Sequence, residues 1–328
     1  MIEAEGRARF HARPVPALEP GHIRVDVRHI GVCGSDLNTF KGLNPLVTLP
    51  RIPGHEIGGV VMEGEGLAPG QRVVVIPYTS CGHCTACRCG RTNACRTNRT
   101  LGVQQDGGLV EQIVLPVDKL IPNDTLLPRH LALVEPLSVG FHAVARGRVG
   151  AGDRVVVIGC GMIGMGCVIG AVAAGAEVIA VDVGAEKVAM AQRFGAAHGV
   201  VQGPDAGAEV NRITGNDGPD IVIEAVGLPA TFTQAIDLVC FAGRVVYVGY
   251  AKAPVTYQTQ VFNLKELDIM GSRNAVLADF HAVIAYLERI GDTAAALITR
   301  VVPFAEAEGA LPYWDAHRGD VLKIVIER

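Results

Sequence analysis

Five of the nine cysteines fall in the short stretch CGHCTACRCGRTNAC. Cys81, Cys84, Cys87 and Cys95 have the spacing C-x2-C-x2-C-x7-C, and four thiolates so spaced can form a closed tetrahedral site around zinc. Such a site has no open position, so we expect it to order a loop that has too little apolar surface to fold alone. Cys89 is left as a non-ligand. The alternatives are a free-thiol cluster or one disulfide, and such a loop alone would also suit a zinc-ribbon binding module.

A nucleotide-binding motif, GCGMIG, follows the apolar run Val155–Ile158. Gly159 permits a tight turn, Gly161 lets the backbone approach a pyrophosphate, and Gly164 lets the next helix pack closely on the strand. The N-terminus of that helix attracts the pyrophosphate. A second apolar strand ends at Asp182, whose carboxylate can bind a ribose 2′-hydroxyl and repels a 2′-phosphate. Glycines alone fit any α/β turn, but this order of strand, helix and acid predicts NAD binding in preference to NADP.

Further potential ligands are dispersed over the segments GVCGSD, PGHE and EPLSVGFHA, which carry Cys33, His55 with Glu56, and Glu135. Each has an ordinary alternative: a lone Cys is commonly a small buried hydrophobe, a lone His a core or surface residue, and a Glu before Pro a helix start. Combined with a hydride-accepting cofactor, they match a catalytic zinc, which takes three protein ligands and keeps one open position. Such a zinc lowers the pKa of a bound hydroxyl and thereby favours alcohol oxidation.

These residues must be positioned by two kinds of structure. Up to about residue 120, short apolar segments separated by Gly and Pro predict a β barrel or sandwich; they include His22–Val27, Gly58–Val61, Arg72–Val75 and Glu111–Leu115. From about residue 135, strands alternate with helices, which predicts a doubly wound sheet of six parallel strands. Its strands are expected at Val155–Ile158, Glu177–Val181, Gly199–Val201, Asp220–Glu224, Arg244–Val248 and Leu267–Met270. We expect the tail, with a helix at Ala278–Ile290 and strands at Ile298–Val302 and Val321–Glu327, to return to the N-terminal β domain.

The composition excludes several classes of protein. With 328 residues, 49% of them hydrophobic and 19% charged, the chain has enough apolar material for about two well-buried domains. The net charge is −4 without a basic block, so no nucleic-acid partner is expected. The N-terminus lacks the apolar region of a signal peptide, and glycines interrupt the longest apolar stretches. We therefore expect a cytoplasmic protein with no membrane partner, in which clustered cysteines bind metal.

Taken in the order GVCGSD, PGHE, four-cysteine loop, EPLSVGFHA, GCGMIG and Asp182, these motifs resemble the zinc-dependent medium-chain dehydrogenase/reductase family over essentially the whole chain. Glu135 stands where the alcohol dehydrogenases carry Cys, as in the sorbitol and threonine dehydrogenase branch. That branch oxidises secondary hydroxyls of polyols, sugar acids and amino-acid alcohols. The resemblance implies an α/β protein with a GroES-like β-rich catalytic domain, residues 1–137 and 275–328, and a doubly wound parallel Rossmann domain, residues 138–274, that binds NAD.

The resemblance also implies two zinc ions per chain, one catalytic and one structural, and a homodimer or homotetramer. Cys33 and His55 would bind the catalytic zinc, with Glu56 and Glu135 as direct, water-mediated or exchanging ligands. Ser35 would take the proton of the alcohol as the first member of a relay. Many relatives end this relay at a His, but this chain has Asn38, which cannot accept a proton in the working pH range. The proton would then leave through water, the cofactor ribose or a carboxylate such as Glu56.

Cofactor and substrate positions follow from the same resemblance. Those matching the adenosine side of NAD are Ile163, Asp182 and Lys187; those matching the nicotinamide side are Val248, Gly249 and Arg273. Arg273 could also reach a substrate hydroxyl or carboxylate, or be a surface charge. Thr39 and Asn274 stand where relatives place aromatic residues, which makes the expected pocket more polar. With Arg273 they favour a small hydroxylated substrate such as a sugar acid or polyol, rather than sorbitol itself.

Three functions remain in view. The first is a zinc-dependent oxidoreductase that transfers hydride from a secondary alcohol to NAD and produces the ketone. The second is a zinc-free enone or quinone reductase that uses NADPH, but it leaves Cys33, His55 and Glu135 without a role and is disfavoured by Asp182. The third is a non-catalytic NAD-binding protein with a structural zinc loop.

Overall fold

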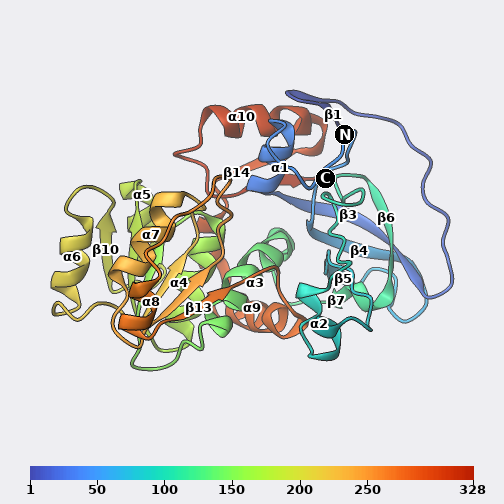
Figure 1. Cartoon of the computed structure of the whole chain (residues 1–328). Coiled ribbons are helices and arrows are strands. Elements are labelled where there is room, and N and C mark those ends of the chain that lie inside the picture. The colour runs from blue at the N-terminus through green and yellow to red at the C-terminus, as the bar shows by residue number, and fades with distance from the viewer. The chain divides into compact units, whose positions relative to one another are not determined.

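The computed structural model describes residues 1–328, and the contacts within the chain divide it into two units. Unit 1 consists of Met1–Pro136 and Val276–Arg328, and unit 2 consists of Leu137–Ala275. Figure 1 shows the helices and strands of both units and labels many of them. Unit 1 is therefore built from two separate stretches of chain, and unit 2 is the stretch that connects them.

A seven-stranded sheet forms the centre of unit 1, in the order β14-β15-β3-β4-β5-β7, with β6 paired to β3. Its pairs are antiparallel except β14 with β15. Because β15 pairs with β3, the tail does return to the N-terminal β domain, as the sequence predicted. The strands of unit 1 are β1 (Ile2–Ala4), β2 (Arg7–Ala8), β3 (His22–Val32), β4 (Glu56–Gly64), β5 (Arg72–Val75), β6 (Gln112–Pro116), β7 (Leu120–Pro122), β14 (Arg300–Pro303) and β15 (Ile324–Glu327).

The central strand β3 carries the core of unit 1 and ends at the first predicted metal ligand. Its β-branched residues suit a pleated, buried surface, and of its eleven residues only Arg28 is exposed. Ile23 and Val25 belong to the main hydrophobic cluster of this unit. Cys33 follows the strand directly, so the packed sheet fixes where its side chain begins.

Short helices fill the connections of unit 1. The helices are α1 (Gly34–Phe40), α2 (Thr85–Arg88), α9 (Leu277–Ile290) and α10 (Ala310–Ala316), with 3-10 segments η1 (Thr92–Ala94), η2 (Val117–Lys119), η3 (Pro128–His130), η4 (Gly291–Leu297) and η5 (Phe304–Gly309). Helix α3 (Leu131–Arg146) begins in unit 1 and continues into unit 2.

Unit 2 is a doubly wound sheet of six parallel strands, in the order β10-β9-β8-β11-β12-β13. The α/β fold class is therefore confirmed. The strands are β8 (Arg154–Ile158), β9 (Glu177–Asp182), β10 (His198–Val201), β11 (Ile221–Glu224), β12 (Arg244–Tyr247) and β13 (Asp268–Gly271). The helices are α4 (Met162–Ala173), α5 (Ala185–Arg193), α6 (Ala206–Ile213), α7 (Pro229–Leu238) and α8 (Gln260–Lys265). In Figure 1, α5 and α6 lie beside the edge strand β10.

The middle strands of unit 2 are continuous apolar runs because neighbouring strands and helices cover them. Val155, Val156 and Val157 of β8 are fully buried. Since all six strands are parallel, their carboxyl ends lie at one edge of the sheet, and dinucleotides bind at this edge in such folds. The residues that follow β8 and end β9 therefore share that edge.

Some elements differ from the sequence expectations. Helices α1 and α8 were not expected, because a segment of six or seven residues is too short to show a helical period. Strand β15 begins at Ile324 and not at Val321, because the backbone N–H of Val321 donates to the carbonyl of His317 at 3.1 Å and so belongs to the turn after α10. No helix combines the length and the apolar character needed to cross a bilayer.

Candidate metal and cofactor sites

Cys33 is held at the junction of β3 and α1 by a carboxylate in the first turn of that helix. Its backbone N–H donates to Oδ2 of Asp36 at 2.9 Å. Oδ1 of Asp36 accepts a hydrogen bond from the backbone N–H of Gly54 at 3.4 Å. Asp36 is only 3% exposed. One buried carboxylate thus ties the segment of Cys33 to the segment of His55.

His55 and Glu56 stand where β4 begins, next to β3. Nδ1 of His55 is buried, lies 4.0 Å from Oδ1 of Asp36 and makes no hydrogen bond. Burial alone would lower the pKa of His55, but the negative charges of Cys33 and Asp36 raise this pKa well above its ordinary value. The imidazole therefore lies in a negative environment that favours a cation.

Glu56 is fully buried, and its counter-ion is the buried ammonium group of Lys323. Nζ of Lys323 donates to Oε2 of Glu56 at 2.6 Å and to the carbonyl of Val32 at 3.1 Å. Burial disfavours the charged lysine, but the charge of Glu56 raises the pKa of Lys323 above its ordinary value. The carboxylate lies against Gly31, where an added Cβ would be 1.8 Å from Oε2 of Glu56. A glycine at this position of β3 is what gives Glu56 room.

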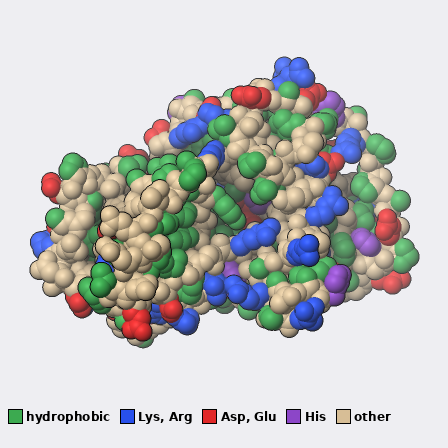
Figure 2. Space-filling view, in the orientation of Figure 1, with side chains coloured by type: hydrophobic (Ala, Val, Ile, Leu, Met, Phe, Trp, Pro, Cys, Tyr) green, Lys and Arg blue, Asp and Glu red, His purple; other side chains and the backbone are tan.

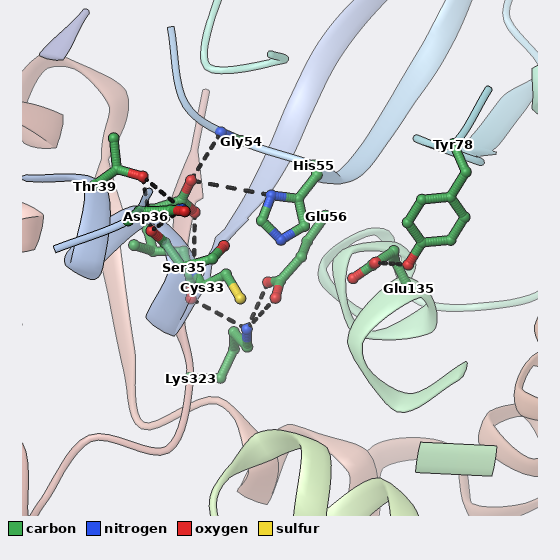
Figure 3. A network of polar contacts seen from close by, with 12 residues as sticks. Cys33, Ser35, Asp36, Thr39, Gly54, His55, Glu56, Tyr78, Glu135 and Lys323 are labelled. Carbon is green, nitrogen blue, oxygen red and sulfur yellow. Dashed lines mark hydrogen bonds and ion pairs between the residues drawn. The ribbon is translucent and has the colours of Figure 1, made fainter. Parts of the chain in front are cut away.

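Glu135 enters the same region from α3, where it is 4% exposed. The hydroxyl of Tyr78 donates a hydrogen bond to its Oε1. Burial raises the pKa of Glu135 to about 7, against the opposing charge of His55. Burial and the nearby Glu135 also raise the pKa of Tyr78 well above its ordinary value. Figure 3 shows the Glu135 carboxylate facing Tyr78 on one side of the group formed by His55 and Glu56.

The structure brings three of the four expected catalytic ligands together. One ligand atom each from Cys33, His55 and Glu56 lies within 4.8 Å of the other two. A thiolate, an imidazole and a carboxylate are donors that zinc accepts, and the unpartnered Nδ1 of His55 and the surplus of acidic groups also fit a cation. Glu135 is outside this group, although His55 and Glu56 both act on its pKa.

The first member of the expected proton relay, Ser35, and one of the three expected substrate contacts, Thr39, lie on α1. Oγ of Ser35 is buried without a hydrogen-bond partner. The hydroxyl of Thr39 donates to the carbonyl of Ser35 at 2.9 Å and accepts a bond from Asn44 at 3.1 Å. Thr39 is 4% exposed, so its hydroxyl is occupied within unit 1. The roles of Ser35 and Thr39 stay predictions.

The four-cysteine loop also has the geometry of a metal site. The sulfurs of Cys81, Cys84, Cys87 and Cys95 all lie within 4.8 Å of one another, and none is in a disulfide. Helix α2 begins after Cys84 and brings Cys87 onto the same turn. The backbone N–H of Cys81 donates to Sγ of Cys95 at 3.3 Å, and this bond contributes most to lowering the pKa of Cys95 to about 6. Cys89 is exposed and outside the group, as expected.

The loop surface is strongly basic. No Asp or Glu occurs between Glu65 and Asp106, while Arg88, Arg91 and Arg96 are exposed. Figure 2 shows Lys and Arg side chains gathered over the region of α2. The exposed arginines give the loop a positive surface, while burial and the hydrogen bond with Cys84 raise the pKa of Cys87 to about 11.

In unit 2, the three glycines of GCGMIG differ in backbone conformation and in the space beside them. Gly159 adopts φ +95°, a conformation that other residues rarely take. At Gly164 an added Cβ would lie 1.7 Å from the carbonyl oxygen of Gly159, so only glycine lets α4 approach the turn. At Gly161, directly before α4, an added Cβ would meet nothing within 4 Å. The space beside Gly161 is what a pyrophosphate would need.

Asp182 ends β9 and binds the glycine-rich turn itself. Oδ2 accepts the backbone N–H of Cys160 at 2.7 Å, and Oδ1 accepts that of Gly184 at 2.8 Å. The carboxylate is half-buried and fixed beside the turn. A ribose could still bond to it, because each carboxylate oxygen accepts more than one hydrogen bond.

The remaining cofactor candidates are all in unit 2. Val248 and Gly249 both donate their backbone N–H to the carbonyl of Glu224, at 2.9 and 3.1 Å. Arg273 is exposed, and Asn274 has φ +50°. Ile163 lies on α4 and Lys187 lies on α5, and both are half-buried. Nothing in these contacts tests their roles, which remain predictions.

A cavity of about 560 Å³ in unit 1 is not the metal site. Its lining includes the N-terminal segment around Phe10, together with Asp36 and Gly54. Cys33, His55 and Glu56 do not line it. Its position therefore gives no information about the substrate.

Four residues of these sites were not identified from the sequence. Asp36 lies in the motif GVCGSD, three residues after Cys33, and that spacing could have indicated its role at the start of α1. Lys323 is a lone lysine in the apolar run VLKIVIE, which was a usable signal for a buried charge. Tyr78 and Glu224 had no signal. Glu224 is fully buried, and its Oε1 accepts the N–H groups of Val226 and Gly227.

Comparisons with known proteins bear on both units. The alcohol dehydrogenase GroES-like domain matches residues 19–128, and the zinc-binding dehydrogenase domain matches residues 163–289. The chain is 35% identical over 298 residues to L-galactonate-5-dehydrogenase of Escherichia coli K12, which covers 89% of this chain and 88% of that protein.

Solved structures that are similar to this chain over its whole length are also dehydrogenases. The alcohol dehydrogenase RspB of Escherichia coli CFT073, complexed with NADH, has a TM-score of 0.92 at 29% identity and covers 100% of this chain and 98% of its own. A zinc-binding dehydrogenase of Sinorhizobium meliloti 1021, bound to NADP, has a TM-score of 0.87 at 30% identity and covers 100% and 98%. Because these two proteins hold different cofactors, they indicate a nicotinamide cofactor without choosing between NAD and NADP.

Proposed function

The chain belongs to the zinc-dependent medium-chain dehydrogenase/reductase family, and we propose that it oxidises a polyol or sugar acid at a secondary hydroxyl with NAD. The family assignment makes it an oxidoreductase that acts on CH–OH donors with a nicotinamide cofactor. The choice of NAD, the two zinc ions and the residue roles are proposals. The observation that carries the catalytic zinc is the convergence of donor atoms from Cys33, His55 and Glu56 within 4.8 Å, and the four cysteine sulfurs within 4.8 Å of one another support the structural zinc.

Five residues of unit 1 have a role in this proposal. Cys33 and His55 hold the catalytic zinc, with Glu56 as the carboxylate that the geometry places beside them. A zinc ion held there would act as a Lewis acid on the substrate hydroxyl, and NAD would take up the hydride. Ser35 would accept the hydroxyl proton at Oγ, which has no hydrogen-bond partner, and would pass its own hydroxyl proton on to water or to the cofactor ribose. Asp36 keeps the Cys33 and His55 segments together.

Unit 2 provides the cofactor site. Gly161 leaves open backbone for the pyrophosphate, and the N-terminus of α4 supplies N–H groups and a positive dipole. Asp182 binds the ribose hydroxyls and repels a 2′-phosphate by its charge, which favours NAD. Arg273 is an exposed cation that suits a substrate carboxylate. The relative that acts on L-galactonate supports a sugar acid as the substrate class.

The proposal is tested by assaying the purified protein with NAD and with NADP against polyols, aldonates and amino-acid alcohols. We expect NADH to form with a polyol or aldonate, and much less turnover with NADP. Removal of metal by a chelator should abolish turnover, and zinc should restore it. Cys33→Ser should remove turnover while NAD affinity, measured by calorimetry, stays close to that of the wild type, because Cys33 lies in unit 1.

Several results would contradict the proposal. Full turnover in Cys33→Ser would exclude the ligand set. Enone or quinone reduction with NADPH by metal-free protein would establish a different chemistry. NAD binding without turnover of any alcohol would leave a cofactor-binding protein that is not a dehydrogenase.

A further inference from the structure

We propose that Tyr78 is a positioning residue of the metal centre: it holds Glu135 beside the donor atoms of Cys33, His55 and Glu56 without letting it join them. This keeps one coordination position for the substrate. The inference rests on the proposed function, because it concerns the same centre.

The contact between the two side chains is buried. Tyr78 is 6% exposed and Glu135 is 4% exposed, and the phenol hydroxyl donates to Oε1 of the carboxylate. A hydrogen bond to a charged group is stronger where water cannot compete for it. In Figure 3 the carboxylate of Glu135 is directed to Tyr78, on one side of His55 and Glu56. Glu135 is thus close to the centre but outside the group that shares one ion.

The Tyr78 ring is fixed by packing. It meets the ring of Phe280 edge to face, with 6.3 Å between the centroids and an interplanar angle of 74°. Phe280, on α9, is fully buried. Such a contact leaves the ring little freedom to turn, so the hydroxyl has a defined position.

The backbone that carries Tyr78 is fixed by the stem of the four-cysteine loop. Tyr78 forms an isolated antiparallel bridge with Thr100. The backbone N–H of Thr79 donates to the carbonyl of Arg99 at 3.1 Å, and that of Leu101 donates to the carbonyl of Pro77 at 3.0 Å. These segments flank the stretch from Cys81 to Cys95, so the loop holds its two ends together next to the Tyr78 ring.

Loss of the Tyr78 hydroxyl would change the preferred partner of Glu135. A buried carboxylate that loses a donor carries a free-energy cost, which binding to a nearby cation relieves. Carboxylate oxygens bind zinc directly, so Glu135 would become a further ligand. A zinc site closed by four protein ligands is structural in type and excludes the substrate. Tyr78 therefore separates an open site from a closed one.

The test compares Tyr78→Phe, which keeps the ring, with Tyr286→Phe, which removes a hydroxyl from another buried tyrosine of unit 1. We expect Tyr78→Phe to release zinc to a chelator about tenfold more slowly from the catalytic site and to lower kcat/KM about tenfold, the scale of outer-shell effects. Cobalt in place of zinc should show an altered visible absorption, because its ligand set changes. Tyr286→Phe should match the wild type in all three measurements.

The double variant Tyr78→Phe with Glu135→Gln decides whether the effect passes through Glu135. We expect Tyr78→Phe to change nothing further in the Glu135→Gln background. Unchanged metal release and spectrum in the single variant would overturn the inference, and so would effects of the same size in both backgrounds. Zinc release and the cobalt spectrum need no substrate, so they test Tyr78 even if no alcohol is oxidised. Alcohol oxidation by the wild type tests the proposed function separately.

Discussion

At the scale of single residues, the feature with the largest expected effect on stability is the buried pair of Lys323 and Glu56. Lys323 is 1% exposed and Glu56 is fully buried, and the two side chains are 267 residues apart in the chain. Removing one partner of such a pair leaves a charge buried without compensation. Because both groups are buried, water cannot solvate the charge that remains when one partner is removed.

We predict that Lys323→Met destabilises the metal-free protein by about 3–5 kcal/mol, because Glu56 then lacks its counter-ion. Urea unfolding followed by the fluorescence of the single tryptophan, Trp314, measures this loss. Adding Glu56→Gln should recover most of it, since the uncompensated charge is gone. Equal stability of the single and double variants would show that lost packing of the lysine stem, and not charge, causes the effect.

The burial of His29 makes the free energy of unfolding depend on pH. His29 lies on β3 and is 6% exposed. Burial lowers the pKa of His29, and the charges of Arg129 and Arg28 lower it further. The nearby Glu327 acts in the opposite direction but does not cancel these effects. The unfolded chain therefore binds a proton more readily than the folded one, so stability falls as pH decreases below about 6.5. We predict that His29→Gln makes the free energy of unfolding less dependent on pH between about 7 and 5. The same pH dependence in His29→Gln as in the wild type would contradict this prediction.

Residue types alone identified Cys33, His55 and Glu56 of the candidate metal centre but not Lys323, and the reason is physical. Cys33, His55 and Glu56 were found because their types are unusual in loop segments rich in Gly and Pro. Lys323 was missed because its partner is remote in sequence, and no local pattern expresses a pair of that kind. Whether Glu56 or Glu135 joins the group depended on their distances to the other donor atoms, which a sequence does not contain.

At the scale of elements, the strand–turn–helix around Gly159 was predictable because its glycines are needed for local reasons, a positive φ at one and a close backbone contact at another. The positive φ of Gly159 and the contact of Gly164 with its carbonyl are both properties of a few consecutive residues. The short helices α1 and α8 were not predictable, because six or seven residues give no period to recognise. Tertiary contacts determine those segments.

We predict that Gly161→Ala and Gly164→Ala have different consequences. At Gly161 an added methyl meets no protein atom, so stability should stay within about 1 kcal/mol while NAD affinity falls at least about tenfold. At Gly164 the methyl collides with the carbonyl of Gly159, so stability should fall by about 1–3 kcal/mol, with NAD affinity also lost. Calorimetry with NAD and thermal unfolding distinguish the two. Unchanged NAD affinity in Gly161→Ala would contradict the assigned pyrophosphate position.

The four-cysteine loop gives a prediction with its own internal control. We expect Cys95→Ser to lose one zinc equivalent per chain, because a buried sulfur of the group is removed. The exposed Cys89, changed to Ser, should keep the full metal content. The midpoint of thermal unfolding should fall only in Cys95→Ser, by about 2–4 °C for each kcal/mol lost. Metal analysis and calorimetry measure both, and equal losses in the two variants would place Cys89 among the ligands.

At the scale of the whole molecule, the sheet of unit 2 ends in two edge strands, β10 and β13. Three of the four residues of β13 are exposed, and Ile269 is 40% exposed. An uncovered apolar edge is a template for pairing with another chain. We therefore propose that two copies pair along β13, in a homodimer or in the dimer half of a homotetramer.

Ile269→Lys should weaken this association, because a charge on an edge strand opposes pairing. Light scattering after size exclusion should show a smaller particle for Ile269→Lys than for the wild type. Val201→Lys, on the opposite edge strand β10, should leave the size as it is. A wild-type monomer, or a loss of association in the Val201 variant alone, would contradict pairing through β13.

The two-part construction of unit 1 has a consequence for synthesis. A ribosome makes Cys33, His55 and Glu56 early, and it makes Lys323 only after the whole of unit 2 has been translated. Until then the carboxylate of Glu56 has no ammonium group to neutralise it, and the strand β3 lacks its neighbour β15. The sheet of unit 1 can therefore be completed, and the charge of Glu56 neutralised, only after the last residues of the chain have been made.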